Sequence, residues 1–102
     1  MAIFKPVTTE AALGTDTSGA SNIGSSEFVR ITNTANENTE HLVTLEQSDG
    51  TVIGTFTLEG HESVIISKAS TDKLFAEDAA VRACGVKIIE VAQPREFVRR
   101  QI

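Results

Sequence analysis

The stretch Glu40–Lys68, EHLVTLEQSDGTVIGTFTLEGHESVIISK, decides the fold because it contains three β-strand patterns separated by two turn signals. Asp49-Gly50 lies between two runs of alternating apolar and polar residues, which is a strong local signal for a β-hairpin. Glu59-Gly60 marks a second turn of the same kind. The stretch therefore predicts a three-stranded antiparallel meander at the centre of the fold.

The alternation gives this meander one apolar face and one face rich in threonine, as expected for a sheet with one side in water. Its second run places apolar residues and a glycine on one face, namely Val52, Gly54, Phe56 and Leu58. A glycine in the middle of a strand predicts a bulge or a close backbone neighbour at Gly54. In the third run, Val64 and Ile66 continue the apolar face, and Ile65 points the other way.

Strand patterns also flank the meander. Glu27–Thr34 alternates in polarity and predicts a strand with Val29 and Ile31 facing inward. Val86–Ala92 is rich in β-branched residues and predicts the last strand, and Pro94 then stops further ladder pairing.

The segment before the last strand is ambiguous. Thr71 is a suitable N-cap and Asp72 follows it, so we expect a short helical turn near residues 71–77. Beyond it, AAVRACG fits a helix ended by Gly85 or a strand kinked there, and we favour a strand beginning around Ala80. Short strands with frequent turn signals predict an all-β fold, either a small antiparallel β-sandwich or a barrel with a central meander.

The two ends of the chain are predicted to lie outside a β-sandwich domain formed by residues 27–92. Residues 1–26 are rich in small polar side chains, which bury too little apolar surface to offset the entropy lost on ordering. We expect an extended arm that is flexible in isolation, with a disordered leader as the alternative. Residues 93–102 form a basic tail. The assembly contacts expected on arm and tail are Ile3, Phe4, Val7, Leu13, Arg95, Phe97, Arg99 and Arg100.

Charge and composition restrict the partners that this chain can have. The net charge of −5 disfavours a general nucleic-acid binder and a polybasic membrane anchor. Three arginines against one glutamate give residues 93–102 a charge of +2, which leaves −7 on the rest. Opposite charges on body and tail favour contacts between copies of the chain, and thus a homo-oligomer, or contacts with an acidic neighbour.

The remaining composition indicates the compartment. A single cysteine cannot form an intramolecular disulfide, so a secreted disulfide scaffold is excluded. Apolar runs are too short for a membrane-spanning helix, and Met1–Glu10 lacks the apolar region of a signal peptide. We therefore expect a protein that is made and assembled in a cytoplasm.

Residues capable of chemistry are few and poorly spaced. His41 and His61 have no metal-ligand spacing to each other or to Cys84, so we interpret both as surface histidines and Cys84 as a buried thiol. The glycines do not form a phosphate-binding loop, and the absence of Trp and Tyr disfavours glycan binding. We expect neither an enzyme nor a bound cofactor or metal.

Three stretches give the chain a resemblance to a known class of proteins. They are KPVTTEAALGT (Lys5–Thr15), FVRITNT (Phe28–Thr34) and GTFTLEGHESVIISKASTDKLFA (Gly54–Ala76). In this order they resemble small virion structural proteins of tailed phages, particularly phages that infect marine cyanobacteria. The C-terminal QPREFVRRQI departs from that pattern.

The resemblance implies a β-sandwich structural protein present in many copies on the phage particle. On this basis we expect a capsid decoration (cement) protein that binds the shell through its terminal arms, with copies of itself and the major capsid protein as partners. A neck or tail component of the same virion is the first alternative. A host-surface adhesion module with a glycan ligand is the second.

Overall fold

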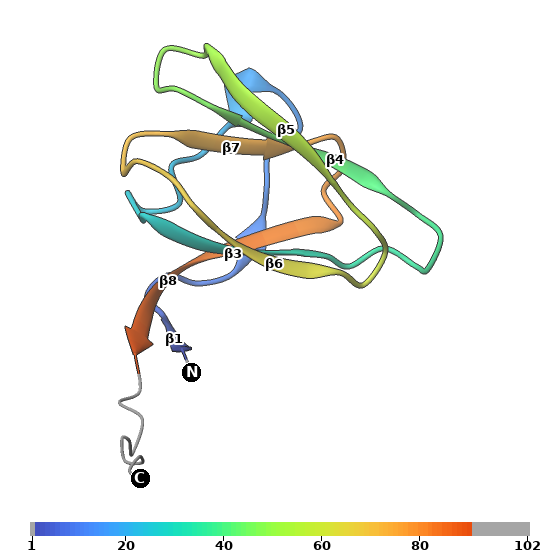
Figure 1. Ribbon diagram of the computed structural model, residues 1–102. Coiled ribbons are helices and arrows are strands. Elements are labelled where there is room, and N and C mark those ends of the chain that lie inside the picture. The colour runs from blue at the N-terminus through green and yellow to red at the C-terminus, as the bar shows by residue number, and fades with distance from the viewer. Residues whose placement is uncertain (1, 91–102) are drawn as a thin grey trace, which may run out of the picture.

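The computed structural model describes residues 2–90 and shows an all-β protein built from two antiparallel sheets (Figure 1). The fold class predicted from the sequence is therefore confirmed. In chain order its elements are β1 (Ala2–Pro6), β2 (Ala11–Ala12), the 3-10 turn η1 (Thr17–Gly19), β3 (Phe28–Asn33), β4 (His41–Glu46), β5 (Val52–Leu58), β6 (Ser63–Ser67), β7 (Lys73–Ala76) and β8 (Val81–Glu90).

The first sheet has the strand order β1-β8-β3-β6, with β2 also paired to β8, and the second has the order β5-β4-β7. The core lies between them. Alternating residues of the first sheet face inward, including Val29 and Ile31 as predicted, and they meet Val43, Leu58 and Leu74 of the second. Period-two alternation in every long strand thus produces a two-layer sandwich.

The predicted meander is half right. The Asp49-Gly50 signal does form a hairpin between β4 and β5, and Gly50 adopts the positive φ of 93° that favours glycine there. The strand β6, however, pairs with β3 in the other sheet, so the Glu59-Gly60 turn carries the chain from one sheet to the other. Either pairing buries the same alternate residues, which is why the polarity pattern does not distinguish them.

Gly54 lies beside a bulge, as its position in the strand predicts. The β4–β5 register shifts between Leu45 and Glu46, so that Ile53 is the extra residue on β5. The other reason for a glycine here, a close backbone neighbour, does not apply, because open space lies beside the Gly54 Cα.

The helical turn expected near residues 71–77 is wrong. Asp72 instead accepts a hydrogen bond from the Ala69 N–H, at 3.1 Å, and closes a turn. The next four residues form β7, in which Leu74 and Ala76 are buried and Lys73 and Phe75 are not. Residues two apart share a face only in a strand, and pairing with β4 overrides the local helix signal. The strand favoured from about Ala80 is confirmed as β8.

The N-terminal segment also differs from the expected flexible arm. Both β1 and β2 pair with β8, and Leu13 is only 4% exposed within the core. The small polar residues between them are held by the edge of β8, because Val7 N–H donates to the Gly85 carbonyl at 2.8 Å and Gly85 N–H donates to Thr8 Oγ1 at 2.8 Å. Hydrogen bonds of the backbone and of a threonine hydroxyl therefore order this segment, although it buries little apolar surface.

Candidate interaction surface

Strands β1 and β8 form a two-stranded ribbon that extends past the start of β3 (Figure 1). Phe28, the first residue of β3, lies opposite Val86, so from Lys87 onward β8 is paired with β1 alone in the described part of the chain. We call residues 2–6 and 87–90 the ribbon. In a two-stranded ribbon neither face is covered by a second layer.

Both faces of the ribbon carry apolar side chains. Ile3 and Ile89 are register partners on one face and are 49% and 43% exposed. Phe4 and Ile88 are partners on the other face, where Phe4 is 39% exposed. Exposed large apolar residues gathered in one place are typical of a surface that contacts another molecule.

The Phe4 face continues onto the outside of the first sheet. The Arg30 guanidinium lies 5.8 Å from the centroid of the Phe4 ring, which is within the range of a cation–π contact. Arg30 also approaches Glu10 at 3.9 Å and donates to Ser63 Oγ at 3.1 Å. These contacts hold the Arg30 side chain on the outer face of the first sheet, next to the ribbon.

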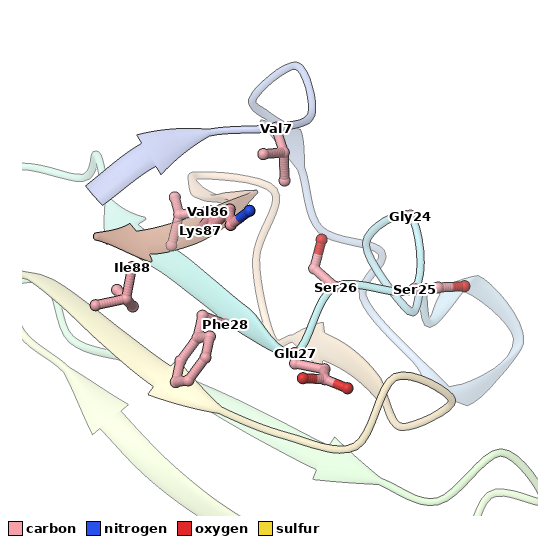
Figure 2. A pocket seen from close by; sticks show the side chains of 9 residues that line it. All are labelled: Val7, Gly24, Ser25, Ser26, Glu27, Phe28, Val86, Lys87 and Ile88. Atoms are coloured by element: carbon pink, nitrogen blue, oxygen red, sulfur yellow. The ribbon is translucent and has the colours of Figure 1, made fainter. Parts of the chain in front are cut away.

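A groove of about 450 Å³ lies at the base of the ribbon. Figure 2 shows Val7 and Phe28 on either side of the end of β8, with Ser25, Ser26 and Glu27 closing the far side. The groove exists because the chain before β3 turns away from β8 through Ile23, Gly24 and Ser25, which all have positive φ. Positive φ is costly for a β-branched residue such as Ile23. Contacts with the surrounding structure must therefore hold the turn in this conformation.

The structure separates the residues predicted as assembly contacts into three groups. Ile3, Phe4 and Val7 are exposed on or beside the ribbon, and Val7 also lines the groove. Leu13 is buried in the core of its own chain and presents no contact surface. Arg95, Phe97, Arg99 and Arg100 lie outside the described residues.

Sequence reasoning missed the contribution of β8 to this surface. Ile88 lines the groove and Ile89 is exposed on the opposite face of the ribbon. Ile88 and Ile89 are adjacent on a strand and therefore point to opposite faces of the sheet. Because only one face of the sheet packs on the core, at least one of them must lie outside it. That signal was present in the sequence.

His41 is less exposed than the surface histidine predicted for it. Its side chain is 13% exposed, with Nδ1 at 3.1 Å from Glu77 Oε2 and Nε2 at 3.9 Å from Asp78 Oδ1. The imidazole therefore lies beside two carboxylates at the end of β7. Within residues 2–90, His, Cys, Asp and Glu side chains form no group of three that would hold a metal ion.

Three ionisable side chains are buried. Burial raises the pKa of the Cys84 thiol, and Glu10 nearby adds to this effect. Burial lowers the pKa of Lys68, against the attraction of Asp72 and Glu27. Glu46 is fully buried on β4, where its Oε2 accepts from Thr17 Oγ1 at 3.3 Å and its Oε1 has no hydrogen-bond partner in the described structure.

Comparisons with protein-family models, with curated proteins and with solved structures found no match for this chain. Among the described residues, the structure contains no helix of the length and apolarity that crossing a membrane requires. What the geometry itself offers is an exposed apolar ribbon with a groove at its base.

Proposed function

We propose that this protein is a non-enzymatic structural protein of a tailed-phage virion, and specifically a capsid decoration protein that binds the shell through its terminal segments. The observation that carries the proposal is the ribbon with its exposed Ile3, Phe4 and Ile89. The resemblance of Lys5–Thr15, Phe28–Thr34 and Gly54–Ala76 to small virion proteins supplies the biological setting.

Pairing of β1 with β8 brings the two ends of the described chain together, as binding through both terminal segments requires. The N-terminal strand and the strand that leads into the C-terminal residues leave the body side by side (Figure 1). Both terminal segments therefore start from one place, and a single contact with a particle can engage both. An exposed apolar patch buried in such a contact contributes about 25 cal/mol for each Å² removed from water.

The partners in this proposal are other copies of the chain and the major capsid protein, in a virion assembled in the host cytoplasm. Nucleic acid and membrane have no part in it, because an acidic chain of net charge −5 is repelled by phosphates. The sandwich body serves as a rigid support for the ribbon.

The test is to locate the chain in density-purified virions of the phage that encodes it. We expect mass spectrometry to detect the chain in many copies per particle, and gold-labelled antibodies to cover the shell in negative stain. Label confined to one vertex of the particle would indicate a neck or tail component instead of a decoration protein. Absence of the chain from purified virions would overturn the proposal, and specific hits on a glycan array would then favour the adhesion module.

A further inference from the structure

The charges of this protein are separated along the chain. From Ile31 to Ser67 there is no lysine or arginine, although six acidic residues lie in this interval. Four of them are exposed glutamates on two neighbouring connections, Glu37 and Glu40 between β3 and β4, and Glu59 and Glu62 between β5 and β6. We call this group the acidic end.

The fully buried side chain of Asn33 holds the acidic end together. Its Nδ2 donates to the Thr39 carbonyl at 2.9 Å and to the Leu58 carbonyl at 3.0 Å, which ties both connections to the end of β3. Its backbone N–H donates to the Glu62 carbonyl at 2.9 Å. Gly60 also packs against the backbone of Asn36, where a Cβ would not fit. The glutamates are thus gathered by a rigid part of the fold.

The ribbon has the opposite charge, because its two lysines against Glu90 sum to +1. Lys5 and Lys87 are direct register partners, on the same ribbon face as Ile3 and Ile89. Like charges placed directly opposite on a β-ladder are destabilising unless a counter-charge lies between them. Among the described side chains neither lysine forms an ion pair, and none of the four glutamates of the acidic end does so either.

These two charged groups lie at opposite ends of β3. The ribbon extends beyond Phe28, which opens β3, and the acidic end is attached at Asn33, which closes it. Figure 1 shows the β3–β4 and β5–β6 connections on the side of the molecule away from the tips of β1 and β8. One molecule cannot bring its own lysines to its own acidic end.

We propose that copies of this chain associate head to tail, with the ribbon of one copy seated against the acidic end of the next. The inference deepens the proposed function by naming the contact between copies. A carboxylate of the second copy would lie between Lys5 and Lys87, while Ile3 and Ile89 lose their exposure. Contacts of this heterologous kind close into a ring or continue as a filament.

Charge also opposes symmetric contacts through these same two surfaces. A two-fold contact between the ribbon faces that carry Ile3 and Ile89 would bring four lysines together. A two-fold contact between acidic ends would do the same with eight glutamates. Like charges brought together across an interface repel, so both arrangements are opposed by the charges that favour the head-to-tail contact.

Two charge-reversal variants test this proposal. The ribbon variant carries Lys5→Glu and Lys87→Glu, and the acidic-end variant carries Glu37→Lys and Glu59→Lys. Glu62 is left unchanged because its Oε1 accepts a hydrogen bond from the Glu59 N–H, at 2.9 Å. Lys5→Arg with Lys87→Arg serves as the charge-conserving control. Circular dichroism and the thermal midpoint show that each variant is folded.

Association is measured by sedimentation velocity over a range of protein concentrations at low salt. We expect the wild type and the arginine control to associate, and each reversal variant alone to associate with a Kd weaker by roughly tenfold or more. An equimolar mixture of the two variants should recover association, because each then meets a complementary end. The variants have net charges of −9 and −1, since each changes the net charge of −5 by four. General attraction between them therefore does not explain a recovery.

A wild type that stays monomeric at every concentration would overturn the inference, as would a mixture that fails to recover. Unchanged association of either variant would overturn it too. These failures are distinct from failure of the proposed function, because detection of the chain in purified virions does not depend on self-association in solution. Added salt of about 0.5 M should weaken the contact, since it shortens the screening length to a few ångströms.

Discussion

Gly85 shows how one residue positions the groove beside the ribbon. It lies in the interior of β8, where glycine is normally unfavourable, and Ser26 from the segment before β3 occupies the space that a side chain would fill. Ser26 itself is buried. The close approach lets the chain turn away from β8 at this point, and the groove opens next to it.

Gly85→Ala is expected to destabilise the fold by roughly 1–3 kcal/mol, because a methyl group would clash with Ser26 in a closely packed place. Urea unfolding followed by circular dichroism measures the change. Gly54→Ala is the matched control, since Gly54 is also within a strand but faces open space. Equal effects of the two substitutions would contradict the role given to Ser26.

Cys84 lies beside Gly85 on β8 and is 6% exposed. Burial limits reagent access and raises the pKa of the thiol, so the reactive thiolate is scarce at neutral pH. We expect Ellman's reagent at pH 8 to modify the native protein roughly a hundredfold or more slowly than the urea-unfolded protein, because reaction requires local opening. A native rate close to the unfolded rate would show that Cys84 is accessible.

At the scale of elements, the sequence indicates where strands lie better than which strands pair. Val29 and Ile31 on β3, and Val64 and Ile66 on β6, alternate as predicted and face inward. Pairing of β6 with β3 rather than β5 depends on long-range contacts, among them those of Asn33. A single polar residue at the end of a strand gives no visible signal of such a role in the sequence.

The strand β7 is the element on which the local signal was misleading. Thr71 and Asp72 look like a helix start, but the residues that follow them bury alternate side chains against β4. Leu74→Ala is expected to cost about 2–5 kcal/mol of unfolding free energy, because Leu74 is fully buried between the sheets. Chemical denaturation measures this cost.

Leu42→Ala is the matched control for that substitution, because Leu42 lies on the neighbouring strand β4 and is 39% exposed. Its cost should be clearly smaller than that of Leu74→Ala. If Leu74→Ala were as mild as the control, the assignment of β7 to the core would be wrong.

The apolar residues of the N-terminal segment, all predicted as assembly contacts, differ in their exposure. Ile3, Phe4 and Val7 are exposed, whereas Leu13, four residues after Thr9, is a core residue. Sparse apolar residues in a polar stretch look alike in the sequence. Only the pairing of β1 and β2 with β8 decides which of them enters the core.

At the scale of the whole molecule, the protein is a rigid sandwich with an apolar ribbon that carries two lysines at one end and an acidic group at the other. The sequence shows the excess of acidic residues and their separation from lysine and arginine. It does not show that the connections carrying Glu37 and Glu59 lie next to each other, or that Lys5 faces Lys87, because both depend on strand pairing over long sequence distances.

Zero-length carbodiimide cross-linking of the self-associated protein tests head-to-tail assembly most directly, because it joins a lysine to a carboxylate only where the two are in contact. Since the ribbon and the acidic end lie at opposite ends of β3, a link between Lys5 or Lys87 and Glu37 or Glu59 can arise only between copies. An equimolar mixture of ¹⁴N- and ¹⁵N-labelled chains confirms this by mass spectrometry.

We predict mixed-isotope peptides that join the ribbon lysines to the glutamates of the acidic end, and their loss in the ribbon variant. Cross-links between copies that join other surfaces, with the ribbon lysines unmodified, would contradict head-to-tail assembly.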